Sequence, residues 1–94
     1  MIEELERPSA IDDADQAVEV LRAWVADENL QATLDPLAFE EPQVWGLLLA
    51  DLARHVANTW ADEAGGAPVD AFRDIVEAFM LEAQASASVQ DEEE

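Results

Sequence analysis

The chain has 94 residues, with 23 acidic and four basic side chains, a formal net charge of −19 and no cysteine. This length predicts one domain, and the absence of cysteine excludes disulfides and thiolate sites. The negative field repels phosphate backbones and anionic lipid headgroups, which argues against direct nucleic-acid binding and membrane binding.

The two ends of the chain differ in composition from the middle. Residues 1–11 are predicted to form a flexible N-terminal arm, and residues 86–94 a disordered acidic tail, since no apolar periodicity persists there. Residues 12–85 are predicted to form a single globular domain. The N-terminus has neither a basic start nor an apolar run, so it does not resemble a signal peptide, and we expect a cytoplasmic protein.

The first predicted helix begins at Asp12 or Asp13 and ends near Asn29. Asp13 suits the N-cap, and Asn29 can adopt the left-handed conformation that ends a helix. The apolar side chains between them follow helical spacing: Ala14, Ala17, Val18, Leu21, Trp24 and Val25.

A short strand is predicted next, at Leu30–Leu34, where apolar and polar side chains alternate. The Asp35-Pro36 pair closes it with a turn. Residues 37–39 form either an irregular connector or a second short strand. The partner of the strand is therefore either this segment or the same strand of a second chain.

The second predicted helix runs from Pro42 to about Glu63, and Gly65-Gly66 ends it. The third begins near Pro68 and ends near Ala85, with an apolar stripe at helical spacing. The predicted fold class is therefore mainly α, or α+β at the margin. It has three helices, with one short strand or hairpin between the first and the second.

The first half of the central helix is apolar on every side. Residues 44–50 carry no charged or polar side chain, and a helix that is apolar all round is buried all round. A chain this short can hardly cover such a segment alone, so we expect a homodimer. The candidate interface residues are Leu30, Ala32, Leu34, Val44, Trp45 and Leu47.

The second half of the central helix carries a polar stripe, Asp51, Arg54, His55 and Asn58, at i, i+3, i+4 and i+7. One interpretation is a small site that binds an anion or moves a proton. The other is a set of local pairs that stabilise the helix. His55 is the only histidine, so no two-histidine metal pair and no complete catalytic set exists, and we predict no metal, no cofactor and no enzyme.

The run Glu41-Pro42, Trp45-Gly46, Ala50-Asp51 and Arg54-His55 resembles a family of small uncharacterised bacterial proteins known as a domain of unknown function. The similarity extends over roughly residues 12–82. It implies a bacterial cytosolic protein and supplies no activity.

The function expected from these observations is a small acidic, non-enzymatic protein-interaction module that self-associates and offers its charge to a basic protein partner. Two alternatives stay open. One is an acidic inhibitor that mimics nucleic acid, and the other is a small-ligand binder that uses Asp51, Arg54 and His55.

Overall fold

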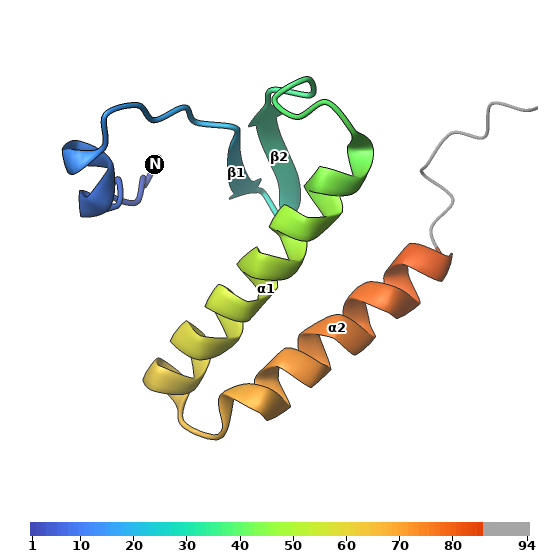
Figure 1. Ribbon diagram of the computed structural model, residues 1–94. Helices are drawn as coiled ribbons and strands as arrows, with labels where there is room; N and C mark the ends of the chain where they lie inside the picture. Colours follow the sequence, from blue (N-terminus) through green and yellow to red (C-terminus); the bar gives the residue numbers. More distant parts are fainter. Residues whose placement is uncertain (86–94) are drawn as a thin grey trace, which may run out of the picture. The chain divides into compact units, whose positions relative to one another are not determined.

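The computed structural model describes residues 1–85; the predicted acidic tail, residues 86–94, lies outside the described residues. Its elements are a short 3-10 helix η1 (Ser9–Asp13), strands β1 (Leu21–Ala26) and β2 (Asn29–Leu34), and helices α1 (Pro42–Ala64) and α2 (Pro68–Ala85) (Figure 1). The chain divides into two compact units, Met1–Glu40 and Glu41–Glu94. Within residues 1–85, neither helix is long and apolar enough to cross a membrane.

The predicted fold class is wrong, because the element order is β-β-α-α and the first of the three predicted helices does not form. Asp12 and Asp13 belong to η1, and residues 21–26 are a strand. Leu21, Ala23 and Val25 alternate with Arg22, Trp24 and Ala26, which is strand periodicity, while Leu21, Trp24 and Val25 also fit helical spacing. Valine and tryptophan favour strands, and pairing with β2 decides between the two patterns.

Strands β1 and β2 form an antiparallel hairpin, so the partner of the predicted strand lies in the same chain. The register pairs Ala26 with Asn29 across a two-residue turn. The turn residues Asp27 and Glu28 have φ of 52° and 70°. Two positive φ values give the turn whose twist matches that of the flanking strands. The left-handed residues are therefore Asp27 and Glu28, whereas Asn29 was expected to be left-handed at a helix end.

The hairpin has one wholly apolar face. Cross-strand pairs on this face are Leu21 with Leu34, Ala23 with Ala32, and Val25 with Leu30. The other face places Arg22 opposite Thr33, Trp24 opposite Gln31, and Ala26 opposite Asn29. Val25 and Leu30 are largely exposed. A two-stranded hairpin is at best marginally stable until such a face is covered.

The Asp35-Pro36 turn is confirmed. The Asp35 N–H donates to the Val20 carbonyl (3.0 Å), and the Asp35 Oδ1 accepts from the Leu37 N–H (3.2 Å). The Ala38 N–H donates to the Asp35 carbonyl (3.1 Å). Residues 37–39 are thus a connector and not a second strand.

Both remaining helices are confirmed, since α1 begins at Pro42 and ends at Ala64, and α2 begins at Pro68 and ends at Ala85. Gly65 (φ 90°) follows α1, and its N–H donates to the Ala61 carbonyl (2.9 Å). A non-glycine residue would be strained in that conformation. The chain then reverses, and α2 packs antiparallel beside α1 (Figure 1).

The contact between α1 and α2 is made through small side chains of α1. Ala57 (1% exposed) and Ala61 (8%) are the buried hydrophobic residues of the described chain. Ala53 and Ala50, one and two turns before Ala57, continue this alanine seam and are half-buried. On α2 the half-buried residues are Ala71, Phe72, Ile75 and Val76. Alanine lets the α2 backbone approach closely, while the larger α2 side chains fill the space.

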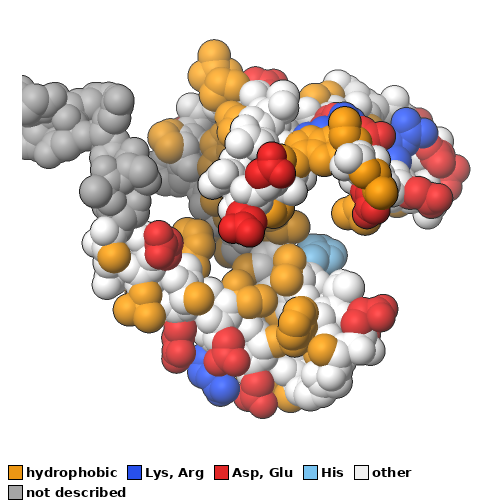
Figure 2. Space-filling view, turned by 180° about the vertical axis from the view of Figure 1, so that it is seen from behind, with side chains coloured by type: hydrophobic (Ala, Val, Ile, Leu, Met, Phe, Trp, Pro, Cys, Tyr) orange, Lys and Arg blue, Asp and Glu red, His pale blue; other side chains and the backbone are white. Residues whose placement is uncertain are grey.

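Many large apolar side chains reach the surface of both units (Figure 2). On α1 these include Leu49, Leu52, Val56 and Trp60, and on α2 they include Val69, Phe79 and Met80. Contiguous exposed apolar patches of this kind mark interaction surfaces.

We expect Ala57→Leu to lower the free energy of unfolding by about 1–3 kcal/mol, because three added carbon atoms force the seam apart. Ala83→Leu, the same change at an exposed position of α2, should shift it by less than about 0.5 kcal/mol. Urea denaturation at fixed protein concentration measures both. Equal losses in the two variants would contradict the seam.

We expect Glu28→Gly to stabilise the hairpin by about 1 kcal/mol, because glycine adopts positive φ without the steric cost that glutamate bears. Gln31→Gly, in the middle of β2, should instead weaken it by about 0.5–1 kcal/mol. Cross-strand amide protection, measured by NMR hydrogen exchange, reports both effects. Loss of protection in Glu28→Gly would show that the turn is not left-handed.

Candidate functional site

The predicted polar stripe lies on the exposed side of α1. The Arg54 Nη1 donates to the Asp51 Oδ1 at 2.7 Å, and both side chains are more than half exposed. His55 and Asn58 are exposed as well. Within residues 1–85, Asp51 pairs with Arg54 and not with His55. The carboxylate therefore holds the guanidinium, and the imidazole is left to solvent.

Arg54 also lies over an aromatic ring of α2. Its guanidinium carbon is 5.7 Å from the centroid of the Phe72 ring, which is within the range of a cation–π contact. Together these groups border a shallow hollow of about 170 Å³. The residues that line it are Arg54, Ala57, Asn58, Pro68, Val69 and Phe72. The hollow thus includes Arg54 and Asn58 of the predicted site, and excludes Asp51 and His55.

This hollow is small for a ligand site, since small-molecule pockets typically measure about 300–1,000 Å³. Its one cation already has a carboxylate partner at 2.7 Å. The remaining guanidinium N–H groups can donate to an anion, but the charge available to attract one is largely neutralised. In the described residues, no group of three or more histidines or acids is placed to hold a metal ion.

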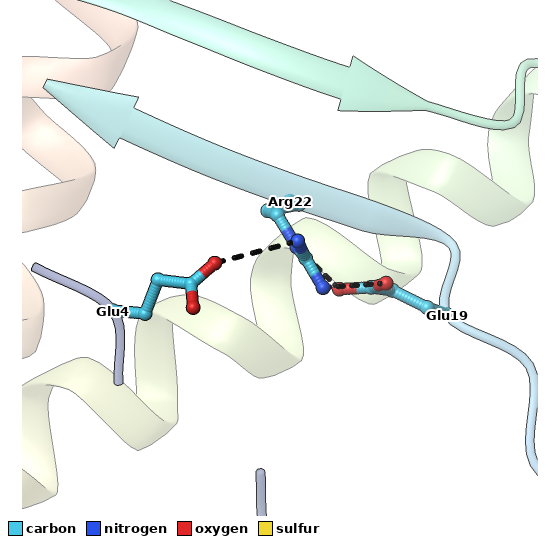
Figure 3. A network of polar contacts seen from close by, with 3 residues as sticks. All are labelled: Glu4, Glu19 and Arg22. Carbon is cyan, nitrogen blue, oxygen red and sulfur yellow. Dashed lines mark hydrogen bonds and ion pairs between the residues drawn. The ribbon is translucent and has the colours of Figure 1, made fainter. Parts of the chain in front are cut away.

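A second polar centre lies at the open end of the hairpin. Arg22 donates from Nε to the Glu19 Oε2 (3.0 Å) and from Nη2 to the Glu19 Oε1 (3.2 Å), and its Nη1 lies 3.7 Å from the Glu4 Oε2 (Figure 3). The hydrogen bonds and charge of Glu19 raise the pKa of the Arg22 guanidinium, which stays a cation at every ordinary pH.

A surface cavity of about 330 Å³ lies beside this arginine. Its lining comes from the start of β1 and the end of β2, which meet at the open end of the hairpin, and consists of Glu19, Val20, Leu21, Arg22, Thr33, Leu34 and Asp35. The sequence did not indicate this centre, because it depends on the unpredicted strand β1. The spacing of Glu19 and Arg22 was the one available signal, and it is too common to identify a site.

The candidate interface residues fall in different surroundings. Leu30, Ala32 and Leu34 share the apolar face of the hairpin. Val44 and Trp45 are half-buried, and Leu47 is 69% exposed. Two residues along a helix is a rotation of about 200°, so Leu47 points away from the side of α1 that carries Trp45.

We expect Asp51→Asn to change the free energy of unfolding by less than about 0.5 kcal/mol, since the pair with Arg54 is exposed. Asp70→Asn breaks a matched i, i+3 pair with Arg73 but also removes a charge from the first turn of α2, so it should cost more. Chemical denaturation of both variants at low and high salt measures these two losses. A loss above about 2 kcal/mol for Asp51→Asn would show that the stripe is structurally essential.

The chain was compared with family models, curated proteins and solved structures. The model of the domain of unknown function DUF5076 matches residues 4–87. Comparison with curated proteins gives no match. A solved structure from the photosynthetic bacterium Rhodopseudomonas palustrus CGA009, described as a candidate pyruvate dehydrogenase, is 35% identical, with a TM-score of 0.73. The alignment covers 100% of this chain and 95% of that one. The resemblance noted in the sequence is thereby confirmed, and the chain belongs to the DUF5076 family of domains of unknown function.

Proposed function

We propose that this protein is a small acidic, non-enzymatic interaction module of the cytoplasm that self-associates through apolar surface. The supporting observation is the small amount of apolar surface that the described residues bury. Ala57 and Ala61 are buried, whereas Leu52, Val56 and Trp60 are 45–62% exposed. Burial of apolar surface is the main favourable term in association, so a partner that covers these side chains gains it.

The charge makes a second, weaker contribution to the proposal. A net charge of −19 attracts basic proteins over several ångströms, and this attraction fades with salt. Each arginine of the chain already lies beside a carboxylate, so the acidic field is uninterrupted by free cations. A basic protein is therefore the second kind of partner that we propose.

The two other functions considered from the sequence have less support. A nucleic-acid mimic needs acids spaced along one face like phosphates, but Asp51 and Asp70 are paired with arginines and Asp27 and Glu28 occupy a turn. A ligand binder at Asp51, Arg54 and His55 has only the shallow hollow of about 170 Å³. The name given to the Rhodopseudomonas protein is not carried over, because a shared fold does not fix chemistry.

Sedimentation equilibrium tests the proposal through its dependence on salt. We expect a dimer at micromolar concentration that becomes tighter between about 0.05 and 0.5 M NaCl, because screening weakens the repulsion between two strongly acidic copies. Association with a basic protein should weaken over the same range. A protein that stays monomeric at ~1 mM in both salts would refute self-association.

A further inference from the structure

Helix α1 carries two apolar stripes, of which one packs on α2 and the other does not. The alanine seam, which includes Ala57 and Ala61, packs on α2. The second stripe, here called the large stripe, consists of Leu49, Leu52, Val56 and Trp60, which are 40–62% exposed. Each alanine of the seam follows a residue of the large stripe by one position, so the two stripes lie roughly 100° apart around α1.

The large stripe contains no charged residue, although 29% of the chain is charged. The charged side chains Asp51, Arg54 and Asp62 lie toward the opposite side of α1, by the same helical spacing. The one carboxylate of α1 on the side of the stripe is Glu63, three residues after Trp60, so between Leu49 and Trp60 a basic partner would find no acid to pair with. The matching surface is an uncharged apolar one, and the large stripe of a second copy is such a surface.

The spacing of the large stripe also matches itself when one copy is reversed. The half-buried Trp45 precedes the stripe, which gives the series 45, 49, 52, 56 and 60. When the second copy runs antiparallel and the two-fold axis passes between residues 52 and 53, Leu49 of one copy lies against Val56 of the other. Position 45 then lies against position 60 of the other copy. This is the self-complementarity that a two-fold dimer requires, because each contact then occurs twice.

The surface area that a stable dimer buries indicates how much of the α1–α2 pair must belong to the interface. A standard interface needs about 800 Å² from each partner, more than four side chains of one helix supply. The hollow at Asn58 and Val69 marks one face of the α1–α2 pair. On α2, helical spacing places the half-buried Ala71 and Ile75 on the other face, roughly 120–160° around that helix from Val69. Two helix pairs that meet through this face form a four-helix bundle.

We infer that the large stripe of α1 is the dimer interface, with a second copy of this chain packed antiparallel across it and Leu52 at the two-fold axis. The inference rests on the proposed self-association and adds the surface and the register. It also gives the exposed Trp60 a partner, the half-buried Trp45 of the second copy.

Disulfide trapping tests the surface without disturbing the core, because the natural chain has no cysteine. Leu52→Cys should form a covalent dimer within minutes of mild copper–phenanthroline oxidation, since the two sulfur atoms meet near the axis. Leu47→Cys is the control: Leu47 lies on the far side of α1 and is more exposed (69%) than Leu52 (45%). Its covalent dimer should nevertheless form at least tenfold less. Circular dichroism confirms that each variant keeps its helices.

The register has its own readout. Leu49→Cys and Val56→Cys should each crosslink poorly with themselves, because seven residues of helix separate the like positions by about 10 Å. Their equimolar mixture should give the mixed disulfide, identified by mass. Preferential Leu49–Leu49 and Val56–Val56 products would overturn the antiparallel register.

The remaining outcomes separate the surface from self-association itself. A dimer by sedimentation whose Leu52→Cys crosslinks no faster than Leu47→Cys would overturn the surface and leave the proposed function standing. A monomer at all concentrations would overturn both. An intrachain disulfide in the double variant Val25→Cys with Leu52→Cys would show that the hairpin of the same chain covers the stripe, and would also overturn the dimer.

Discussion

The alanine seam between α1 and α2 is the constraint on which the helical half of this protein depends. Ala57 and Ala61 are buried where the methyl groups of α1 meet α2, whose larger side chains fill the space between the helices. This close approach brings Phe72 under the Arg54 guanidinium, at 5.7 Å. The side of α1 that packs on α2 is occupied by small residues. The large side chains Leu52, Val56 and Trp60 therefore lie on a different side of α1, where they are exposed. The shallow hollow beside Arg54 and the exposed large stripe thus both follow from the packing of α2 on the alanine seam.

Charge shapes the surface without holding the fold together. Each arginine contacts a carboxylate within 3.2 Å, and both side chains of each pair are more than half exposed. The four arginines are Arg7, Arg22, Arg54 and Arg73. Pairs of this kind contribute roughly 0–1 kcal/mol each. Their main effect is to remove the few positive charges from a surface that is otherwise acidic, which favours solubility and sets which partners can approach. Stability must come from apolar contacts, and those are incomplete in the described part of a single chain.

The features that depend on local backbone chemistry, such as helix ends, could be predicted from the sequence. The strand that depends on pairing with a distant segment could not. Pro42, Gly65 and Pro68 mark helix ends through their own backbone restrictions, so α1 and α2 were predicted within a residue or two. Strand β1 was assigned to a helix because Leu21, Trp24 and Val25 fit both periods, and the deciding term, hydrogen bonding to β2, lies outside the segment. The same division holds at the site. The Asp51–Arg54 pair is local and was foreseen as one of two options, whereas Phe72 reaches Arg54 only through the rotational setting of α2.

A seam made of alanines has a mechanical consequence. Repeated methyl groups at Ala50, Ala53, Ala57 and Ala61 present nearly the same surface at each turn, so sliding one helix along the other by one turn would meet little resistance from the seam itself. Shear between packed helices is a common mode of motion in proteins. The connection limits such sliding, since only Gly65, Gly66 and Ala67 separate α1 from α2. The short turn therefore limits how far one helix can move along the other. A longer turn would allow larger displacements along the seam.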